Sequence, residues 1–531
     1  MPPALVAEMQ AAIDRQGDFE AVRRPATPPP TGPPTVSTAA TTTTATTTGG
    51  RATTLRIIST NDFHGGLEAR QDGTSGRRGG AGQLAGVIRR LQSECTASCT
   101  SVLVDGGDLF QGTPASNLAF GRPVIALYNA LGYAAAAVGN HDFDWSQDTL
   151  RARMRDAKFS MLAANITDAA GKAVPWIRPD TMVERGGVKI GIIGLALLAT
   201  PVTTMPSNVA TLRFVPGGPI VAERARQLRA RGADLVIVIA HASFDCTESC
   251  RGELADVAQQ AGGTVDAFVG GHSHNEASAM IGGVPLMRAR SSGRAVAVVD
   301  LPMNRAERAS VMPRVVYVQS DSVTPEAGIV RLVDAAVAPV RELVAKPIAT
   351  NAVELRRAGP QHALGNLIAD AQRAAGGTDV GVMNNGGIRA TLAAGPVTFG
   401  ALYEVQPFGN MLMRLTATGA ALKAYLERIV RGPQPNAHVS GVVLRYDPER
   451  PPGDRIVELT VGGKPLDPNH TYTVTMSDFM ATGGDGLAFA AQKGPVETGI
   501  SDLDALITFV QSQPGAVIRA DPIVRLAPVP K

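Results

Sequence analysis

Five of the eight histidines in this 531-residue chain lie in short polar segments, each directly after a run of small or β-branched apolar residues. Carboxylate, amide and imidazole groups occur together in these segments. This mixture suits borderline divalent metals such as Mn, Fe, Co or Zn, whereas all-oxygen sites suit Mg or Ca. The residues are Asp62 and His64 in NDFHG, Asp108 in DGGD, Asn140 and His141 in GNHDFD, His241 in AHASF, and His272 and His274 in GGHSH.

Each of these segments has an ordinary structural explanation when taken alone, such as a turn, a helix cap or polar surface. Together they offer more ligands than the three protein ligands that one catalytic metal usually takes. Two divalent ions that share a carboxylate fit the number better. We therefore expect a dinuclear metal site.

The apolar runs before these segments have the length of buried strands: LRIIST, SVLV, AAAAV, DLVIVIA and DAFV. Helical stretches such as GGAGQLAGVIRRLQSE alternate with them, which predicts a layered α/β domain over residues 53–324. The carboxyl ends of parallel strands meet at one edge of a sheet, so the polar segments can converge there. Residues 325–346 are predicted to form a connecting helix, and 347–531 a second α/β domain.

The N-terminal segment, residues 1–52, has a different composition. MPPALVAEMQAAIDRQ could form a short amphipathic helix, and the Pro/Thr-rich stretch over 22–52 is expected to be a disordered linker. No signal peptide is visible at this N-terminus, and no apolar run is long enough to span a membrane. The 50 basic and 47 acidic residues nearly balance, which argues against extended nucleic acid as a partner.

The four cysteines form two C-x-x-x-C pairs, Cys95 with Cys99 and Cys246 with Cys250. Two small disulfide loops are the favoured interpretation, and they would place the protein in an oxidising compartment, either periplasmic or secreted to the cell surface. A zinc ion held by all four thiolates and cross-paired disulfides are the alternatives that the spacing leaves open.

The series D-x-H, GGD, GNHD-x-D, a later His and GH-x-H resembles the calcineurin-like metallophosphoesterases, in particular the 5′-nucleotidase and UDP-sugar hydrolase branch, over residues 55 to 490. The resemblance implies a layered β-sandwich with flanking helices. It also implies that one metal is held by Asp62, His64 and His274 and the other by Asn140, His241 and His272, with Asp108 bridging them. His141 would contact the phosphoryl group or the leaving group, oriented by Asp144, and Asp142 has no assigned chemistry.

Motifs of the second domain, VMNNGGIR, VQPFGN and DFMATGGDG, resemble the C-terminal 5′-nucleotidase domain. The resemblance implies that Asn384 and Arg389 contact nucleoside or phosphate, that the rings of Phe408 and Phe479 sandwich the base, and that Asp485 binds the ribose hydroxyls. Each residue alone could equally be turn or core. A phosphate-binding arginine is expected near 357, where Arg357 fits after a one-residue gap and Arg356 is the alternative.

The resemblance implies hydrolysis of nucleoside 5′-monophosphates, and of nucleoside diphosphate derivatives such as UDP-sugars. A 2′,3′-cyclic-nucleotide phosphodiesterase with 3′-nucleotidase activity is the main alternative. A thiosulfohydrolase and a surface nucleotide-binding protein without catalysis are further ones. A rotation of the two domains about the connecting helix is also implied, and the sequence leaves the oligomeric state open.

Overall fold

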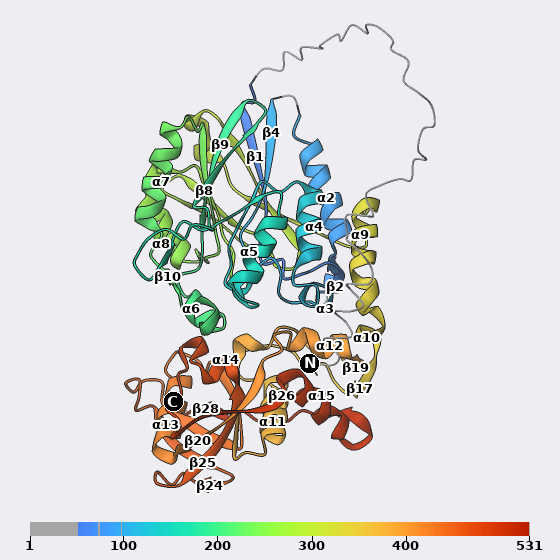
Figure 1. Cartoon of the computed structure of the whole chain (residues 1–531), viewed down its shortest axis with the longest axis vertical. Helices are drawn as coiled ribbons and strands as arrows, with labels where there is room; N and C mark the ends of the chain where they lie inside the picture. Colours follow the sequence, from blue (N-terminus) through green and yellow to red (C-terminus); the bar gives the residue numbers. More distant parts are fainter. Residues whose placement is uncertain (1–50, 73–74, 97, 530–531) are drawn as a thin grey trace, which may run out of the picture.

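The computed structural model describes residues 51–72, 75–96 and 98–529. The expected amphipathic helix and almost all of the Pro/Thr-rich linker lie outside these ranges. Two bodies are stacked along the long axis of the described chain, with the blue-to-yellow first domain above the orange-to-red second domain (Figure 1). The two-domain α/β fold is confirmed, whereas the limits of the domains stay a prediction.

The first domain contains two six-stranded sheets. In the first, the strands follow the order β16 (Arg314–Tyr317), β15 (Ala295–Pro302), β1 (Thr54–Thr60), β4 (Cys99–Asp105), β5 (Ala135–Ala137) and β6 (Ser160–Leu162). In the second, the order is β13 (Ala277–Ile281), β14 (Val284–Arg288), β12 (Ala267–Val269), β11 (Leu235–Ala240), β9 (Val188–Leu195) and β8 (Asp180–Arg185). Strands β1, β4, β5 and β6 run parallel, as do β9, β11, β12 and β14. Their carboxyl ends therefore share one edge of the sandwich.

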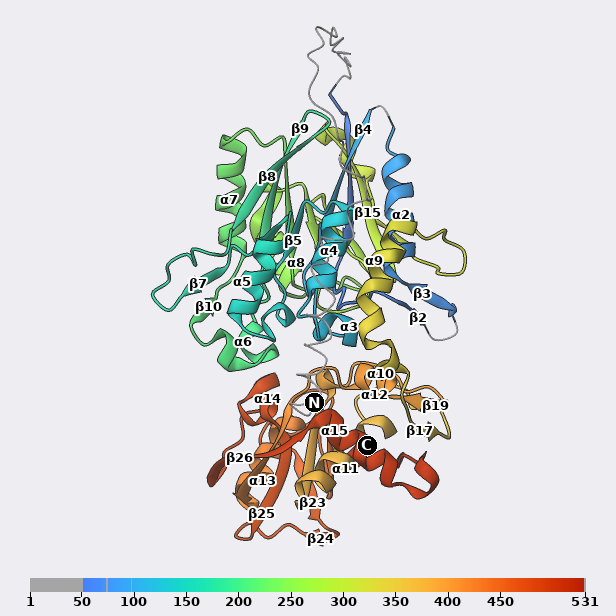
Figure 2. The same ribbon diagram turned by 45° about the vertical axis from the view of Figure 1, so that its right-hand side comes forward.

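Alternation along the strands separates the inner and outer cores. In β11, Leu235, Ile237 and Ile239 pack between the two sheets, while Val236 and Val238 face outward. The first sheet is covered on its outer face by α2 (Ala81–Ser93), α4 (Arg122–Leu131) and α9 (Ala327–Val337), and the second by α7 (Gly218–Ala230) and α8 (Glu253–Ala261) (Figure 2). The resulting order of layers is helix, sheet, sheet, helix, as expected for a β-sandwich with flanking helices.

The segment between the domains is helical but is not one continuous helix. Helix α9 is followed by a 3₁₀ turn over Ala338–Val340 and by the short α10 (Arg341–Ala345). Pro339 lies in this turn and lacks the amide hydrogen that a continuous α-helix requires. The apolar spacing that predicted a single helix over 325–346 therefore overlooked this proline.

The second domain is built on a five-stranded sheet with the order β21 (Ala437–Ser440), β18 (Val380–Asn384), β25 (Thr471–Ser477), β20 (Met411–Thr418) and β26 (Lys493–Ser501). One face packs against α11 (Ala363–Gly376), α12 (Phe399–Val405) and α15 (Asp502–Ser512). The other face packs against α13 (Gly419–Ile429) and a smaller sheet of β24 (Lys464–Pro465), β23 (Ile456–Val461), β22 (Val442–Tyr446) and β28 (Leu526–Pro528). A third sheet consists of β19 (Gly395–Thr398), β17 (Pro347–Asn351) and β27 (Val517–Ile518).

All four cysteines form disulfides, Cys95 with Cys99 and Cys246 with Cys250. The two short loops favoured by the spacing are therefore the pairing found, and neither a four-thiolate zinc site nor cross-pairing occurs. Within the described ranges, no helix is both long and apolar enough to cross a membrane.

Candidate dinuclear metal centre and substrate pocket

Seven candidate metal ligands lie at the edge where the parallel strands end. Asp62 and His64 follow β1, Asp108 follows β4, and Asn140 precedes the 3₁₀ turn His141–Phe143 after β5. In the second sheet, His241 follows β11, and His272 and His274 follow β12. The sandwich thus brings residues from both of its sheets to one place.

The ligand atoms of two groups of these residues converge. Asp62, His64 and His274 form one group and Asp62, Asp108 and His241 form the other, with the ligand atoms of each group within 4.8 Å of one another. His64 Nε2 lies 3.1 Å from His274 Nε2, and His241 Nε2 lies 3.1 Å from Asp108 Oδ2. Both groups contain Asp62, so the two clusters are adjacent.

Asn140 Oδ1 is buried and has no hydrogen-bond partner among the described residues, and His241 Nε2 faces the Asp108 carboxylate. Two of the ligand histidines are held through Nδ1: His241 Nδ1 lies 2.9 Å from the Gly106 carbonyl and His64 Nδ1 lies 2.7 Å from the Gln111 carbonyl. A ring oriented in this way offers Nε2 to a cation. A buried polar atom without a hydrogen-bond partner is costly, so the arrangement at Asn140 fits bound metal.

The backbone at the ligands is strained in a way that also suits a metal site. Five ligands have positive φ, a conformation that is rare for residues other than glycine: Asp62 (50°), His64 (49°), Asp108 (59°), His272 (74°) and His274 (62°). Position 139 requires glycine, because a Cβ there would lie 2.1 Å from Asp108 Oδ1. This backbone strain recurs at the ligands, which indicates that the geometry of the site outweighs the backbone conformation that these residues prefer locally.

Burial sets the charge state of most of the cluster. It lowers the pKa of His64 to about 3 and that of His272 to about 3, which leaves neutral rings able to coordinate a cation. It raises the pKa of Asp62 to about 6. Burial also opposes ionisation of Asp108, but the neighbouring His241 and His141 hold the pKa of this carboxyl well below its usual value. Of the two carboxyl groups in the cluster, Asp108 is therefore the one whose ionised form is more strongly favoured.

His141 and Asp144 form a hydrogen-bonded pair beside the cluster. His141 Nδ1 lies 2.8 Å from Asp144 Oδ2, and the Thr204 hydroxyl donates to Asp144 Oδ1 at 2.8 Å. Burial lowers the pKa of His141, but Asp144 and Asp108 raise it by more, so the net shift is upward. The imidazole is thereby oriented and biased toward its protonated form.

Asp142, to which the sequence assigned no chemistry, ties two ligand segments together. Its Oδ1 accepts from the Leu109 amide at 2.9 Å and its Oδ2 from the Gly139 amide at 2.8 Å. The segment that carries Asp108 is thus joined to the segment that carries Asn140. The carboxylate of Asp142 was visible in the sequence, but its burial and the long-range partner that gives it this role were not.

A cavity of about 400 Å³ lies between the two domains next to the cluster. Residues from both domains line it. From the first domain these include Asn140, His141, Asp144 and His272. From the second domain they include every proposed substrate residue except Arg357, namely Asn384, Arg389, Phe408, Phe479 and Asp485. Its size is within the range of small-molecule sites. Two of the seven expected metal ligands, Asn140 and His272, and five of the six expected substrate residues therefore line one cavity.

Arg389 connects the second domain to the metal cluster. One of its terminal nitrogens lies 3.3 Å from His274 Nε2 and 3.5 Å from His64 Nε2. The guanidinium carbon lies 5.5 Å from the centre of the Phe408 ring, whose centre is 5.3 Å from that of His141. A guanidinium in this position can meet a phosphate bound at the cluster.

The remaining residues of the second-domain site are held by one another. Asn384 Nδ2 donates to Asp485 Oδ2 at 2.7 Å. Phe479 packs over Gly484, where a Cβ would lie 2.4 Å from the ring. Asn384 ends β18, Phe479 lies in α14 (Asp478–Ala481) and Asp485 lies in the following 3₁₀ turn. This part of the pocket is thus shaped before any ligand binds.

Of the two candidate phosphate arginines, Arg356 is paired with Glu354, at 2.5 Å. Arg357 has no ion pair with a described residue, and burial together with the charge of Arg389 lowers its pKa. Arg357 therefore lies near Arg389 as a free cation, although it does not line the cavity.

Contacts that the sequence did not predict join the domains around the cavity. Asn117 Nδ2 donates to the Pro407 carbonyl at 3.0 Å and to the Tyr403 hydroxyl at 2.9 Å, and Gln111 Nε2 donates to the same carbonyl at 3.1 Å. Arg70 pairs with Glu404 at 3.0 Å. These bonds fix the end of α12 and hence the position of Phe408.

Comparisons with known proteins agree with this architecture. Residues 55–276 match the calcineurin-like phosphoesterase family, and residues 344–493 match the 5′-nucleotidase C-terminal domain. Snake venom 5′-nucleotidase of Naja atra is 30% identical over 497 residues, which cover 81% of this chain and 90% of that protein. Endonuclease YhcR of Bacillus subtilis (strain 168) is 28% identical over 491 residues, which cover 86% of this chain but only 40% of that longer protein.

A solved structure shares the fold across both domains. The 5′-nucleotidase precursor from Thermus thermophilus superposes with a TM-score of 0.80 at 26% identity, covering 90% of this chain and 100% of that one. The metal cluster, the cavity between two domains and the matched sequences agree. The chain belongs to the 5′-nucleotidase family of metal-dependent phosphoester hydrolases.

Proposed function

We propose that the protein hydrolyses nucleoside 5′-monophosphates to nucleoside and phosphate. The observation that carries this proposal is the single cavity in which candidate metal ligands of the first domain face Arg389, Asp485 and two phenylalanine rings of the second. Membership of the 5′-nucleotidase family supports the same reaction class. Cleavage of nucleoside diphosphate derivatives such as UDP-sugars is proposed as a second activity of the same site.

Two divalent ions, Mn, Zn, Co or Fe, are proposed as the cofactor. Asp62, His64 and His274 would hold one ion, and Asn140, His241 and His272 the other, with Asp108 between them. Asn140 Oδ1, which has no hydrogen-bond partner among the described residues, falls within the second set, as does His241, whose Nε2 lies 3.1 Å from Asp108 Oδ2. Such a pair of ions supplies Lewis acidity, which activates water for attack on phosphorus and neutralises charge on the phosphoryl oxygens.

His141 is the proposed general acid. Asp144 holds Nδ1 of its ring at 2.8 Å, which leaves Nε2 to carry the proton that the departing 5′ oxygen of the nucleoside takes up. The same ring can donate a hydrogen bond to a phosphoryl oxygen as negative charge develops there. Thr204 keeps Asp144 in place through its second carboxylate oxygen.

The second domain is proposed to bind and orient the nucleotide. Arg389, assisted by Arg357, would neutralise phosphate oxygens. Phe408 and Phe479 would stack on the base, and Asp485 with Asn384 would bind the ribose hydroxyls. Stacking contributes roughly 1 to 3 kcal/mol per base and tolerates different bases, so we expect a broad nucleotide preference.

An oxidising compartment, periplasmic or extracellular, is the proposed location. Both C-x-x-x-C pairs form disulfides, and intracellular reducing conditions would disfavour them.

A panel of substrates tests the activity. AMP, 3′-AMP, 2′,3′-cyclic AMP and UDP-glucose would be incubated with the protein and added Mn. Phosphate release would be measured for the two monophosphates, and loss of substrate for the cyclic nucleotide and UDP-glucose, whose first hydrolysis yields monoesters and no free phosphate. Turnover of AMP above 3′-AMP and the cyclic nucleotide is expected. Preference for the cyclic nucleotide and 3′-AMP would instead support the phosphodiesterase alternative. Nucleotide binding without turnover after metal reconstitution would indicate a binding protein, and inactivity on all four compounds contradicts the proposal.

A further inference from the structure

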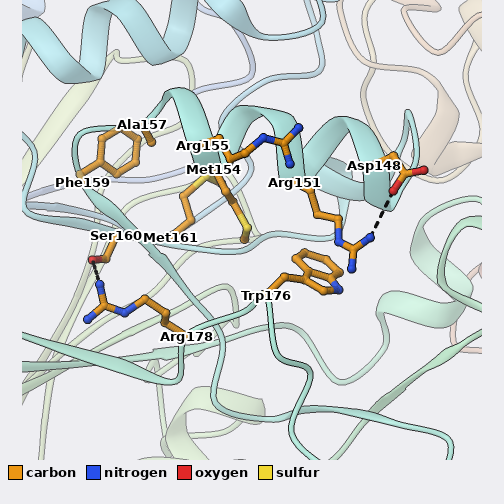
Figure 3. Close-up of a pocket in the computed structure, with 10 residues that line it drawn as sticks. All are labelled: Asp148, Arg151, Met154, Arg155, Ala157, Phe159, Ser160, Met161, Trp176 and Arg178. Atoms are coloured by element: carbon orange, nitrogen blue, oxygen red, sulfur yellow. Dashed lines mark hydrogen bonds and ion pairs between the residues drawn. The ribbon is translucent and has the colours of Figure 1, made fainter.

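One arginine of the first domain is buried without a carboxylate partner. Arg155 and Arg178 are exposed and line a surface groove beside α5 (Gln147–Asp156), as Figure 3 shows. Arg288, which ends β14, has only 2% of its surface exposed and forms no ion pair with a described residue. A buried charge without a counter-ion is costly, so other interactions must stabilise it. The other buried arginines of the described ranges all have such a partner: Arg153 with Asp156, Arg308 with Asp266, and Arg525 with Asp370.

The hydrogen bonds of Arg288 go to two segments that carry candidate metal ligands. Its Nε donates to the Asn275 carbonyl at 2.7 Å and one terminal nitrogen donates to Asn275 Oδ1 at 2.9 Å. The other terminal nitrogen donates to the Phe244 carbonyl at 3.1 Å, and the guanidinium carbon lies 5.2 Å from the centre of the Phe244 ring. Asn275 directly follows His274, and Phe244 lies three residues after His241. One side chain thus joins ligand segments of both proposed ions.

The segment 271–275 is in need of such a restraint. Ser273 and Asn275 are exposed, so they contribute little packing. His272 and His274 have positive φ, 74° and 62°, and residues other than glycine keep this conformation only where the surrounding structure enforces it. The bonds from Arg288 restrain the segment from its buried side.

The residue after Arg288 holds a third ligand segment. The Ala289 amide donates to Asn61 Oδ1 at 2.7 Å, and Asn61 Nδ2 donates to the Ala289 carbonyl at 3.1 Å and to Asp62 Oδ2 at 2.7 Å. Strand β14 itself carries none of the seven candidate ligands. Its end therefore supports the metal centre without contributing a ligand to it.

We propose that Arg288 is a positioning residue that sets the affinity of the protein for its metal ions. It holds the segments of His241 and His274 at the spacing that the ions require, which reduces the ordering that metal binding must impose. A positive charge close to the site would by itself oppose cation binding, so the hydrogen bonds of Arg288 carry the effect. This inference rests on the proposed dinuclear centre.

Titration of the metal-free full-length chain with Mn²⁺, followed by the electron paramagnetic resonance of free Mn²⁺, measures the affinity without substrate. Arg288→Met keeps a long side chain but removes every donor. It should bind Mn²⁺ roughly 10- to 100-fold more weakly, the usual effect of losing a residue that orients metal ligands. Arg308→Met is the matched control, because Arg308 is also buried but is bonded to Asp266, Pro302 and Met303.

The control separates positioning from general stabilisation. Arg308→Met should lower the urea concentration at which the metal-free protein unfolds and leave its Mn²⁺ affinity unchanged. The Mn²⁺ concentration that gives half-maximal phosphate release from AMP should rise in Arg288→Met by the same factor as the dissociation constant. An equal loss of Mn²⁺ affinity in the two variants overturns the proposal.

Asn275→Ala keeps the proposal testable if Arg288→Met does not fold, because Asn275 is exposed. This variant removes one of the two acceptors that Asn275 offers and should weaken Mn²⁺ binding about threefold. Unchanged affinity in Arg288→Met, or in Asn275→Ala where Arg288→Met does not fold, overturns the role of Arg288. Binding of Mn²⁺ by the unmutated protein without turnover of any nucleotide would contradict the proposed function alone, since the variants are compared without substrate.

Discussion

The two halves of the catalytic cavity are constructed differently. In the first domain, the candidate ligands leave Asn140 Oδ1 without a hydrogen-bond partner among the described residues and have positive φ at five positions, compared with one, Asp485, among the proposed substrate residues of the second. In the second domain, Asn384 is bonded to Asp485 and Phe479 is packed over Gly484. The first half therefore depends on bound cations to satisfy it, whereas the second is satisfied by its own side chains. The difference separates residues that perform chemistry from residues that provide shape.

Removal of the metals should produce the largest difference between the two halves of the cavity. A chelator is expected to abolish phosphate release and to accelerate amide hydrogen exchange in the segments 61–66, 106–113, 139–144 and 271–275, because these lose their cation partners. Exchange in 384–389 and 479–486 should stay the same. Equal acceleration in both sets would show that the second half also depends on the metals.

Loss of the His141 imidazole should come next in size. His141→Ala is expected to lower kcat by roughly 10² to 10⁴, the usual contribution of a general acid, while the metal content stays the same. Asp144→Asn should have a smaller effect in the same direction because the ring remains. His470→Ala, an exposed histidine of the second domain, is the control. A His141→Ala protein that retains full activity would remove His141 from the reaction.

A change in the second half should affect binding rather than chemistry. Phe479→Ala is expected to raise KM about tenfold with little change in kcat, because one stacking contact of roughly 1 to 3 kcal/mol is lost. Phe479→Tyr should restore most of the affinity. A fall in kcat with unchanged KM would mean that this ring contributes to the transition state.

The last prediction concerns stability rather than activity, through a buried carboxylate of the second domain. Asp502 Oδ1 accepts from the Leu503 amide at 2.8 Å and Oδ2 from Asn410 at 3.1 Å, and burial raises its pKa to about 7. Since this pKa is higher in the folded than in the unfolded state, the contribution of Asp502 is fully present below about pH 4 and is lost as the pH rises through 7.

Urea unfolding between pH 4 and 7 measures this contribution. Asp502→Asn should remove a pH dependence of at most about 1.4 kcal/mol per pH unit from the free energy of unfolding. Asp256→Asn, at an exposed site on α8, should not. Identical pH profiles for the unmutated and Asp502→Asn proteins would exclude Asp502 as the source.

The parts that sequence predicted well are those carried by local patterns. Short apolar runs followed by NDFHG, DGGD, GNHDFD, AHASF and GGHSH gave both the strands and the residues at their ends, because a buried strand leaves a recognisable run of apolar residues. The two disulfides were also favoured by a local pattern, because the cysteines of each pair are only four residues apart. Pro339, which interrupts the connecting helix, was also visible in the sequence. The helical spacing of the apolar residues around it nevertheless led to the prediction of one continuous helix.

Interactions between distant segments could not be predicted. The role of Asp142 depends on an amide 33 residues away, and the bonds from Asn117 to α12 and the following segment span 286 and 290 residues. Nothing local marks any of these partners.

The sequence by itself therefore determined the residue types of the site, the strands that precede them and the disulfide loops. Tertiary structure alone decided which ligand atoms meet and that Arg389 reaches the metal cluster from the other domain. The physical reason is that periodicity and residue type report the surroundings of a few neighbouring residues. Convergence of side chains hundreds of residues apart is instead set by the packing of two sheets and two domains.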